Sequence, residues 1–290
     1  MRAMHWRWVL PLFALIALLF GCGAPSSGVA NPPKEKIYSK VVSLSPSTSE
    51  LIGELGAGTY LVGRSASCDR PEQMMNVKIV VNGTTPDYEQ ITELAPDLIV
   101  YDKSLYSDEV VAKLQALGFE TLELNAQTID EFRDFCEKLA SRIAIEMTMS
   151  RYLDKVYQSV ALASGRKTTK PRTTILLGDG SEGYLVMGAK GLQAFVIEKC
   201  GATPIGVDGE KFAEMNLEKL IDLDPEIIYS DGSAAAVLSD ARLQGLSAVK
   251  NKHVYNIDGK DILRFGARMH TIIDEIGLKV YEMPVSEVAR

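Results

Sequence analysis

The chain has 290 residues, with 38 acidic and 31 basic side chains and a formal net charge of −7 at pH 7. This acidic balance argues against nucleic acid and anionic membrane surfaces as partners, because both are negatively charged themselves. The length is enough for two domains of ordinary size, each with its own hydrophobic core.

Residues 1–21 are predicted to be a signal peptide that takes no part in the fold. Arg2 and Arg7 precede an apolar run from Trp8 to Phe20, which is short for a membrane span and typical of a secretory signal. The segment ends in Leu-Phe-Gly before Cys22, an ending that resembles the lipobox of bacterial lipoproteins. An ordinary signal peptide followed by a chance cysteine is the alternative.

The mature chain is expected to begin at Cys22, where more than one acyl chain would anchor it to a membrane. Its location would be extracytoplasmic, in the periplasm or on the outer face of the cell membrane. Residues 22–37 are rich in Gly, Pro, Ser and Ala and are predicted to be a flexible tether. Removing Arg2 and Arg7 from the 31 basic residues leaves 29 against 38 acidic ones, a net charge of −9.

Strands and helices are predicted to alternate through a first lobe, residues 38–142. Short apolar runs of β-branched character indicate the strands, and apolar residues at helical spacing indicate the helices. The expected strands are 40–44, 60–64, 78–81, 97–101 and 121–124, and the expected helices are 50–55, 87–94, 107–117 and 129–140.

A longer helix is predicted over 146–163, with charged and apolar faces and no Pro or Gly, and it is expected to connect the lobes within residues 143–168. The second lobe, residues 169–290, is predicted to repeat the same order of strands and helices. Its expected strands include 173–177 and 253–257, and its expected helices include 191–199 and 267–280.

One segment occurs twice, which supports the division into lobes. Tyr88 to Asp102 returns as Leu217 to Asp231, each position displaced by 129 residues (217 minus 88). In both copies an N-cap residue, Asp87 or Asn216, precedes a short helix, a proline ends it, and an apolar strand follows. We therefore predict an α/β fold of two lobes with mostly parallel sheets, joined by a single long backbone helix.

The chain resembles the extracytoplasmic solute-binding proteins of ABC-type importers for iron-siderophore complexes and cobalamin. The resemblance covers nearly all of residues 38–290 and depends on the order and spacing of several motifs, each weak alone. These are VVSLSPSTSELIGELGAG at 41–58, YEQITELAPDLIVYD at 88–102, GLQAFVIEKCGA at 191–202, LEKLIDLDPEIIYSD at 217–231 and RFGAR at 264–268.

This resemblance implies the class III periplasmic-binding-protein fold and a monomeric carrier without catalytic chemistry. Such a carrier holds an iron chelate (a siderophore complex or haem) or cobalamin between its lobes and delivers it to a membrane permease dimer. The connecting helix resists bending, so opening and closing are expected to be small. A carrier of a different metal complex, or an extracytoplasmic two-lobed enzyme of hydrolase type, are the alternatives.

Glu89 and Glu218 occupy the first turns of the two repeated helices. The helix dipole favours a carboxylate there by about 0.3 to 1 kcal/mol, which is a sufficient local reason for both residues. In the family that the chain resembles, glutamates at the matching places face arginines of the permease dimer. The resemblance therefore implies a docking role for this pair, one glutamate in each lobe.

Ligand-binding residues are expected just beyond the carboxyl ends of the parallel strands, where open α/β sheets bind their ligands. Arginine can bind anionic oxygens through the several N–H donors of its planar guanidinium group, and tyrosine offers a flat apolar ring with a polar hydroxyl at its end. The candidates are Ser47, Ser67, Arg70, Thr84, Tyr101, Tyr184, Arg264 and Phe265.

No catalytic residue, metal site or cofactor is predicted. The sequence contains neither GxSxG nor HExxH, and the two mature histidines, His253 and His270, are too few for a bare-ion carrier. Catalysis by a loop serine, Ser45 or Ser181, assembled with His270 is the remaining enzymatic alternative. The three other mature cysteines, 68, 136 and 200, leave either at least one free thiol or one disulfide pair.

Overall fold

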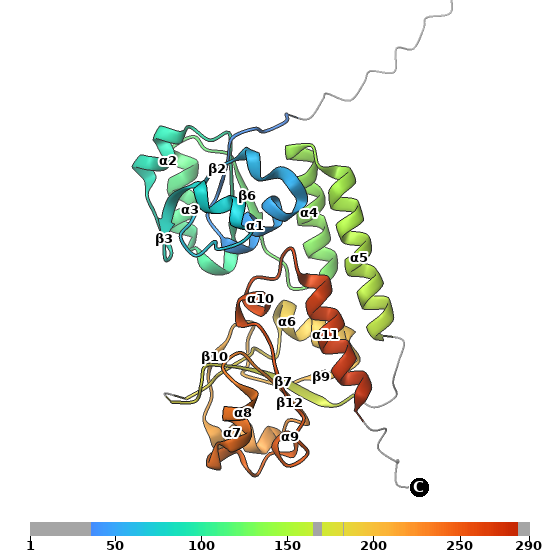
Figure 1. Cartoon of the computed structure of the whole chain (residues 1–290). Coiled ribbons are helices and arrows are strands. Elements are labelled where there is room, and N and C mark those ends of the chain that lie inside the picture. The colour runs from blue at the N-terminus through green and yellow to red at the C-terminus, as the bar shows by residue number, and fades with distance from the viewer. Residues whose placement is uncertain (1–35, 165–169, 182, 284–290) are drawn as a thin grey trace, which may run out of the picture. The chain divides into compact units, whose positions relative to one another are not determined.

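The first sheet forms where short runs of β-branched and apolar residues alternate with amphipathic segments. The computed structural model (Figure 1) describes residues 36–164, 170–181 and 183–283. The strand order of the first sheet is β4-β3-β2-β1-β5-β6. All neighbouring strands are parallel except the β3–β4 pair. The strands are β1 (Val41–Ser43), β2 (Leu61–Ser65), β3 (Lys78–Asn82), β4 (Thr85–Pro86), β5 (Leu98–Asp102) and β6 (Thr121–Leu124).

Helices connect these strands, as predicted. They are α1 (Pro46–Ile52), α2 (Tyr88–Leu94), α3 (Asp108–Ala116) and α4 (Ile129–Ile143), with shorter helical turns at Gly53–Ala57, Gly58–Tyr60, Glu72–Asn76 and Lys103–Leu105. The first helix begins at Pro46, earlier than the predicted start at residue 50. Proline suits the first turn, because its fixed φ is helical and its missing N–H would have no partner there.

The second sheet has the order β10-β8-β7-β11-β12, and β9 also pairs with β7. Strands β9, β7, β11 and β12 are parallel, whereas the two-residue strands β8 and β10 are antiparallel and were not predicted. The prediction of mostly parallel sheets is therefore confirmed. The strands are β7 (Arg172–Leu177), β8 (Leu185–Val186), β9 (Thr203–Pro204), β10 (Ala213–Glu214), β11 (Ile227–Ser230) and β12 (Val254–Asn256).

Helices of 4 to 14 residues pack around this second sheet (Figure 1). They are α6 (Gly191–Lys199), α7 (Leu217–Leu223), α8 (Ala234–Ser239), α9 (Ser247–Lys250), α10 (Gly259–Leu263) and α11 (Met269–Glu282), with a turn at Ala241–Leu243. Together with the first sheet they form the two-lobed α/β architecture that the sequence predicts.

The two copies of the repeat fold alike. Asp87 and Asn216 accept the capping hydrogen bonds of α2 and α7. Each helix then ends at a left-handed residue just before proline: Ala95 at φ 46° and Asp224 at φ 42°. The strands that follow, β5 and β11, are buried interior strands, each next to an edge strand of its sheet.

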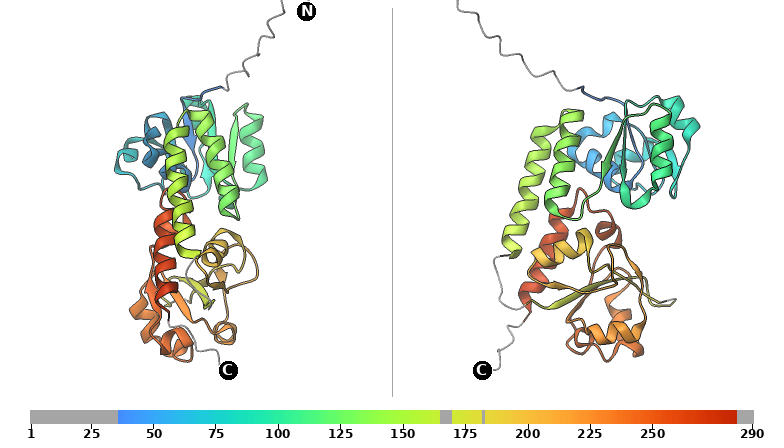
Figure 2. Two further views of the ribbon diagram at one scale, coloured as in Figure 1. Left: turned by 90° about the vertical axis from the view of Figure 1, so that its right-hand side faces the viewer. Right: turned by 180° about the vertical axis from the view of Figure 1, so that it is seen from behind.

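Helix α5 (Glu146–Ser164) follows α4 and packs along α11, so it connects the two halves of the main core (Figure 2). The approach between these helices is close: a Cβ atom on Gly277 of α11 would lie 2.8 Å from Cβ of Ala163. The Tyr152 hydroxyl of α5 also donates to the Gly266 carbonyl oxygen. A small residue at 277 is therefore needed for this packing.

The predicted signal peptide, Cys22 and the tether up to residue 35 lie outside the described residues. The lobe limits at 142 and 168 stay predictions. Cys68, Cys136 and Cys200 are all buried and free, so the first of the two cysteine alternatives holds. Within the described ranges, no helix combines the length and apolar character needed to cross a bilayer.

Candidate functional site

A cavity of about 650 Å³ lies between loops of the two lobes. This volume falls within the range of small-molecule and cofactor sites, about 300 to 1,000 Å³. The lining residues from the first lobe are Pro46, Ser47, Ser67, Asp102, Lys103, Ser104, Leu105, Leu124, Asn125, Ala126 and Gln127. Those from the second lobe are Gly191, Leu192, Gln193, Glu210, Lys211, Phe212, Lys260, Leu263, Arg264 and Phe265.

The topology explains why the first-lobe residues meet. Ser47 follows β1, Ser67 follows β2, residues 102–105 end and follow β5, and residues 124–127 end and follow β6. These four strands are parallel, so their carboxyl ends lie along one edge of the sheet, as is usual for ligand sites in α/β folds. In the second lobe, residues 260–265 likewise follow β12.

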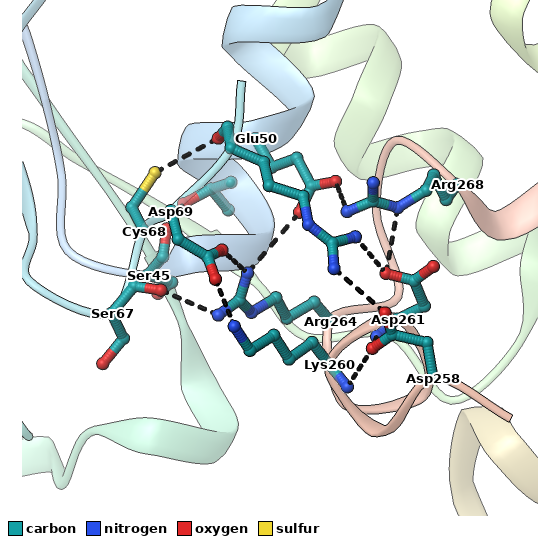
Figure 3. Close-up of polar contacts among 12 residues, drawn as sticks. Ser45, Glu50, Ser67, Cys68, Asp69, Asp258, Lys260, Asp261, Arg264 and Arg268 are labelled. Atoms are coloured by element: carbon teal, nitrogen blue, oxygen red, sulfur yellow. Dashed lines mark hydrogen bonds and ion pairs between the residues drawn. The ribbon is translucent and has the colours of Figure 1, made fainter. Parts of the chain in front are cut away.

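An ionic cluster joins the lobes beside the cavity (Figure 3), and two of its members, Lys260 and Arg264, line the cavity. Asp69 of the first lobe accepts from Arg264 and Lys260 of the second. Arg264 also donates to the Ser67 carbonyl oxygen at 2.7 Å, and its side chain is 11% exposed. Burial alone would raise the pKa of Asp69, but the hydrogen bonds from Arg264 and Lys260 outweigh it and hold that pKa below its ordinary value.

Arg70 adds a second connection within this cluster. Its Nη1 donates to Asp261 at 2.7 Å and its Nη2 to Asp258 at 3.0 Å. Burial would raise the pKa of Asp258, but the hydrogen bond from Arg70 helps to lower it overall. Arg70 is therefore already engaged with two carboxylates.

Glu50 is the most buried member, with a side chain that is 4% exposed. It pairs with Arg268, and the Arg264 Nη1 atom lies 3.9 Å from its Oε2. Arg268 also contacts Asp261, at 2.9 Å from Nε. Burial raises the pKa of Glu50 above its ordinary value, although Arg268 and Arg264 act in the opposite direction. The cluster thus contains four acidic and four basic side chains: Glu50, Asp69, Asp258 and Asp261 with Arg70, Lys260, Arg264 and Arg268.

Two further contacts cross between the lobes at the cavity lining. The Gln127 Nε2 atom donates to Glu210 at 2.6 Å, and the Lys211 Nζ atom donates to the Ser104 carbonyl oxygen at 3.1 Å. All four of these residues are exposed, so water competes for both hydrogen bonds and each contributes at most about 1 kcal/mol. The remaining lining includes apolar side chains, among them Leu105 and Leu263, which are 40% and 53% exposed. An amphipathic molecule suits such a mixture of apolar and charged groups.

Four of the predicted ligand residues line this cavity: Ser47, Ser67, Arg264 and Phe265. Their contact with a ligand stays a prediction. Arg264 differs from the expectation in one respect, because Asp69 already neutralises its guanidinium. Arg264 therefore forms part of the cavity wall, and its guanidinium is not free to bind an anionic ligand.

The other four predicted residues lie elsewhere. Thr84 is exposed in the turn between β3 and β4, and Arg70 belongs to the ionic cluster without lining the cavity. Tyr101 and Tyr184 are buried, and their hydroxyls bond to Glu123 at 2.6 Å and to Asp240 at 3.3 Å.

Strand alternation explains the position of Tyr101. Successive side chains of β5 point to opposite faces, and Ile99 and Tyr101 share a core with residues of α3. The Tyr101 ring packs edge-on against Tyr106 at 6.3 Å between centroids. Tyr101 was expected in the cleft because it lies near the end of β5, but its side chain faces the helix α3 that covers this face of the sheet.

Sequence reasoning missed three segments of the lining: 125–127, 191–193 and 210–212. The first follows β6, so the strand-end rule could have found it. The last follows an irregular segment with glycines at 206 and 209, which has no periodicity to mark its role.

The histidines do not gather into a metal site. His270 packs its ring against Tyr152, and burial lowers its pKa. Neither His270 nor His253 lines the cavity. Throughout residues 36–164, 170–181 and 183–283, no group of three or more His, Cys, Asp or Glu side chains is placed to hold an ion.

Glu89 and Glu218 are exposed in the first turns of α2 and α7, each two residues after its N-cap. The structure therefore places them equivalently in the two lobes. Their docking role stays a prediction.

Comparison with known proteins gives a consistent result. Residues 41–260 match the family described as periplasmic binding protein. The vitamin B12-binding protein of Vibrio cholerae serotype O1 is 24% identical over 265 residues, which cover 90% of this chain and 95% of that protein. The vitamin B12-binding protein of Yersinia pseudotuberculosis is 26% identical over 199 residues, 68% of this chain and 71% of that protein.

Solved structures show the same fold. The vitamin B12 binding protein BtuF of Vibrio cholerae superposes with a TM-score of 0.73 at 22% identity, covering 85% of this chain and 99% of that one. The haem binding protein HutB of the same species gives 0.70 at 21%, covering 83% and 98%. Helicobacter pylori CeuE with Ni(II) bound gives 0.71 at 23%, covering 83% of each chain.

Proposed function

The chain belongs to the periplasmic binding protein family, and we propose that its interlobe cavity captures a metal chelate, haem or cobalamin for delivery to an ABC-type importer. The observation that carries the proposal is the cavity of about 650 Å³ beyond the carboxyl ends of β1, β2, β5, β6 and β12. Relatives and structural neighbours named for the binding of vitamin B12 and haem support this class of ligand.

The prediction that the chain is not an enzyme is confirmed, since the family and the relatives are binding proteins. The hydrolase alternative therefore has no support. A carrier needs no catalytic group, only a preformed site with a few placed polar groups among apolar surface.

Anchoring and delivery complete the proposal. Acyl chains on Cys22 would keep the carrier beside the membrane, and Glu89 and Glu218 would present one carboxylate from each lobe to a symmetric permease dimer. Their equivalent exposed positions on α2 and α7 support this docking role.

Calorimetric titration of the mature chain tests the ligand class. The panel contains a ferric trihydroxamate, a ferric tris-catecholate, haemin and cyanocobalamin. An amino acid, a sugar and Zn²⁺ are titrated separately, as competitor ligands from other classes. At least one chelate, haemin or the corrinoid should bind tightly with a stoichiometry of one. Failure of all four, together with binding of a competitor, would overturn the proposal.

A blocked variant tests the place of binding. Ala126 lines the cavity, so Ala126→Trp should fill part of it and weaken binding strongly. Ala235, an exposed residue of α8, provides the matched control, because Ala235→Trp adds the same side chain away from the cavity. Equal affinities for the two variants would place the ligand elsewhere.

A further inference from the structure

Residues 206–212, called here the 206–212 loop, are held firmly to the second lobe. The backbone N–H of Val207 donates to Met187 at 3.0 Å, and the Val207 carbonyl oxygen accepts from Ala189 at 2.8 Å. A Cβ atom on Gly188 would lie only 2.4 Å from the Gly209 carbonyl oxygen, so the two backbones approach as closely as glycine allows. Side chains carried by this loop are therefore positioned before a ligand arrives.

Three consecutive side chains of the loop, Glu210, Lys211 and Phe212, line the cavity. Glu210 already accepts from Gln127 across the cavity. Phe212 is partly exposed and supplies an aromatic surface. Lys211 is exposed and carries a positive charge beside that surface.

The four cationic side chains that line the cavity differ in their ion-pair and hydrogen-bond partners. Lys103 pairs with Asp108, and both Lys260 and Arg264 pair with Asp69. Lys211 instead donates to the Ser104 carbonyl oxygen, a neutral acceptor. Among the cations of the lining, Lys211 is the one whose hydrogen-bond acceptor in the structure is uncharged, so an anionic acceptor adds an opposite charge that the Ser104 carbonyl does not supply.

We propose that Lys211 determines specificity by binding an anionic oxygen of the chelate, such as a carboxylate or catecholate oxygen, while Phe212 contacts its apolar part. On binding, the ammonium exchanges the Ser104 carbonyl for the ligand oxygen. The Ser104 carbonyl oxygen is an uncharged acceptor and both residues are exposed, so water can replace the bond that is given up and the exchange costs little. This inference rests on the proposed function and names the charge that the ligand should carry.

The test compares a ferric tris-catecholate, which is anionic, with a neutral ferric trihydroxamate, using Lys211→Met. Methionine keeps an unbranched stem and removes the charge. Lys190→Met is the matched control, because Lys190 is an exposed cation near the same loop, pairs with Asp208 and does not line the cavity. Lys211→Arg keeps the charge and should retain most of the affinity.

The wild-type chain should bind the anionic chelate more tightly. Lys211→Met should weaken that complex by about tenfold or more, equal to about 1.4 kcal/mol, and change the neutral complex little. Lys190→Met should change neither.

Preference of the wild-type chain for the neutral chelate, or equal losses in Lys211→Met and Lys190→Met, would overturn the inference while leaving the carrier function intact. Failure of the wild-type chain to bind any chelate, haemin or corrinoid would instead remove the proposed function on which the inference rests.

Discussion

Removal of Arg268 should destabilise the protein through its effect on Glu50. The Glu50 side chain is 4% exposed, and the substitution Arg268→Met leaves its carboxylate with Arg264, whose Nη1 lies 3.9 Å away. Removing one partner of a buried ion pair costs about 3 to 5 kcal/mol. Because Arg264 remains, we expect the lower end, about 3 kcal/mol of unfolding free energy.

Acid should partly rescue this variant. Burial raises the pKa of Glu50, so the folded state favours the protonated form, and the stability that this preference contributes is lost as pH rises through the folded-state pKa. Without Arg268 the pKa should rise further. The stability difference from wild type should therefore shrink as pH falls toward 4.5, the ordinary value.

Urea unfolding followed by circular dichroism measures these differences. A double-mutant cycle adds Glu50→Gln, which removes the charge but keeps the shape of the side chain. The double variant should be more stable than Arg268→Met alone, since no buried charge is left unpaired. Arg151→Met, at an exposed arginine of α5, is the control and should change little. An Arg268→Met variant as stable as Arg151→Met would refute the reasoning.

Three other predictions follow from the anchor, the docking residues and the helix packing. Cys22→Ser should release the protein from membranes without changing ligand affinity, as fractionation and titration would show; retention of the processed variant would contradict it. Glu89→Lys with Glu218→Lys should abolish reconstituted uptake but spare ligand binding, whereas Glu109→Lys, at the same first-turn position of α3, should leave uptake normal. Gly277→Leu should lower the unfolding free energy by about 1 to 3 kcal/mol, because the larger side chain overpacks against α5. Gly245→Ala is the control and should be tolerated, since a Cβ atom there meets nothing within 4 Å.

Local sequence was sufficient to predict most of the fold. Cap residues and prolines marked the limits of α2 and α7, and buried β-branched runs marked β5 and β11. The two-residue strands β4, β8, β9 and β10 were not predicted, because they are too short to show alternation. The pairings of β9 with β7 and of β10 with β8 join strands that are distant in sequence, whereas β4 and β8 pair with the strands that directly precede them.

The site was less predictable, for a physical reason. The strand-end rule depends only on the parallel topology, and three residues that it selects, Ser47, Ser67 and Arg264, line the cavity, while their contact with a ligand stays a prediction. The rule does not specify where a side chain points or which partner it finds. It therefore could not predict that Tyr101 faces a helix or that Arg264 pairs with Asp69. Lys211 was missed, because its position depends on close packing of the 206–212 loop against residues 187–190.

Hydrogen exchange of the protein with and without saturating chelate tests the central claim, binding in the interlobe cavity, most directly. Binding there should slow amide exchange in segments from both lobes, above all 102–105, 124–127, 210–212 and 260–265. A second, smaller cavity of about 240 Å³, lined by residues of α4 and α5 including Arg133 and Tyr157, gives the contrasting location. Protection confined to 133–157, or to one lobe alone, would contradict the account.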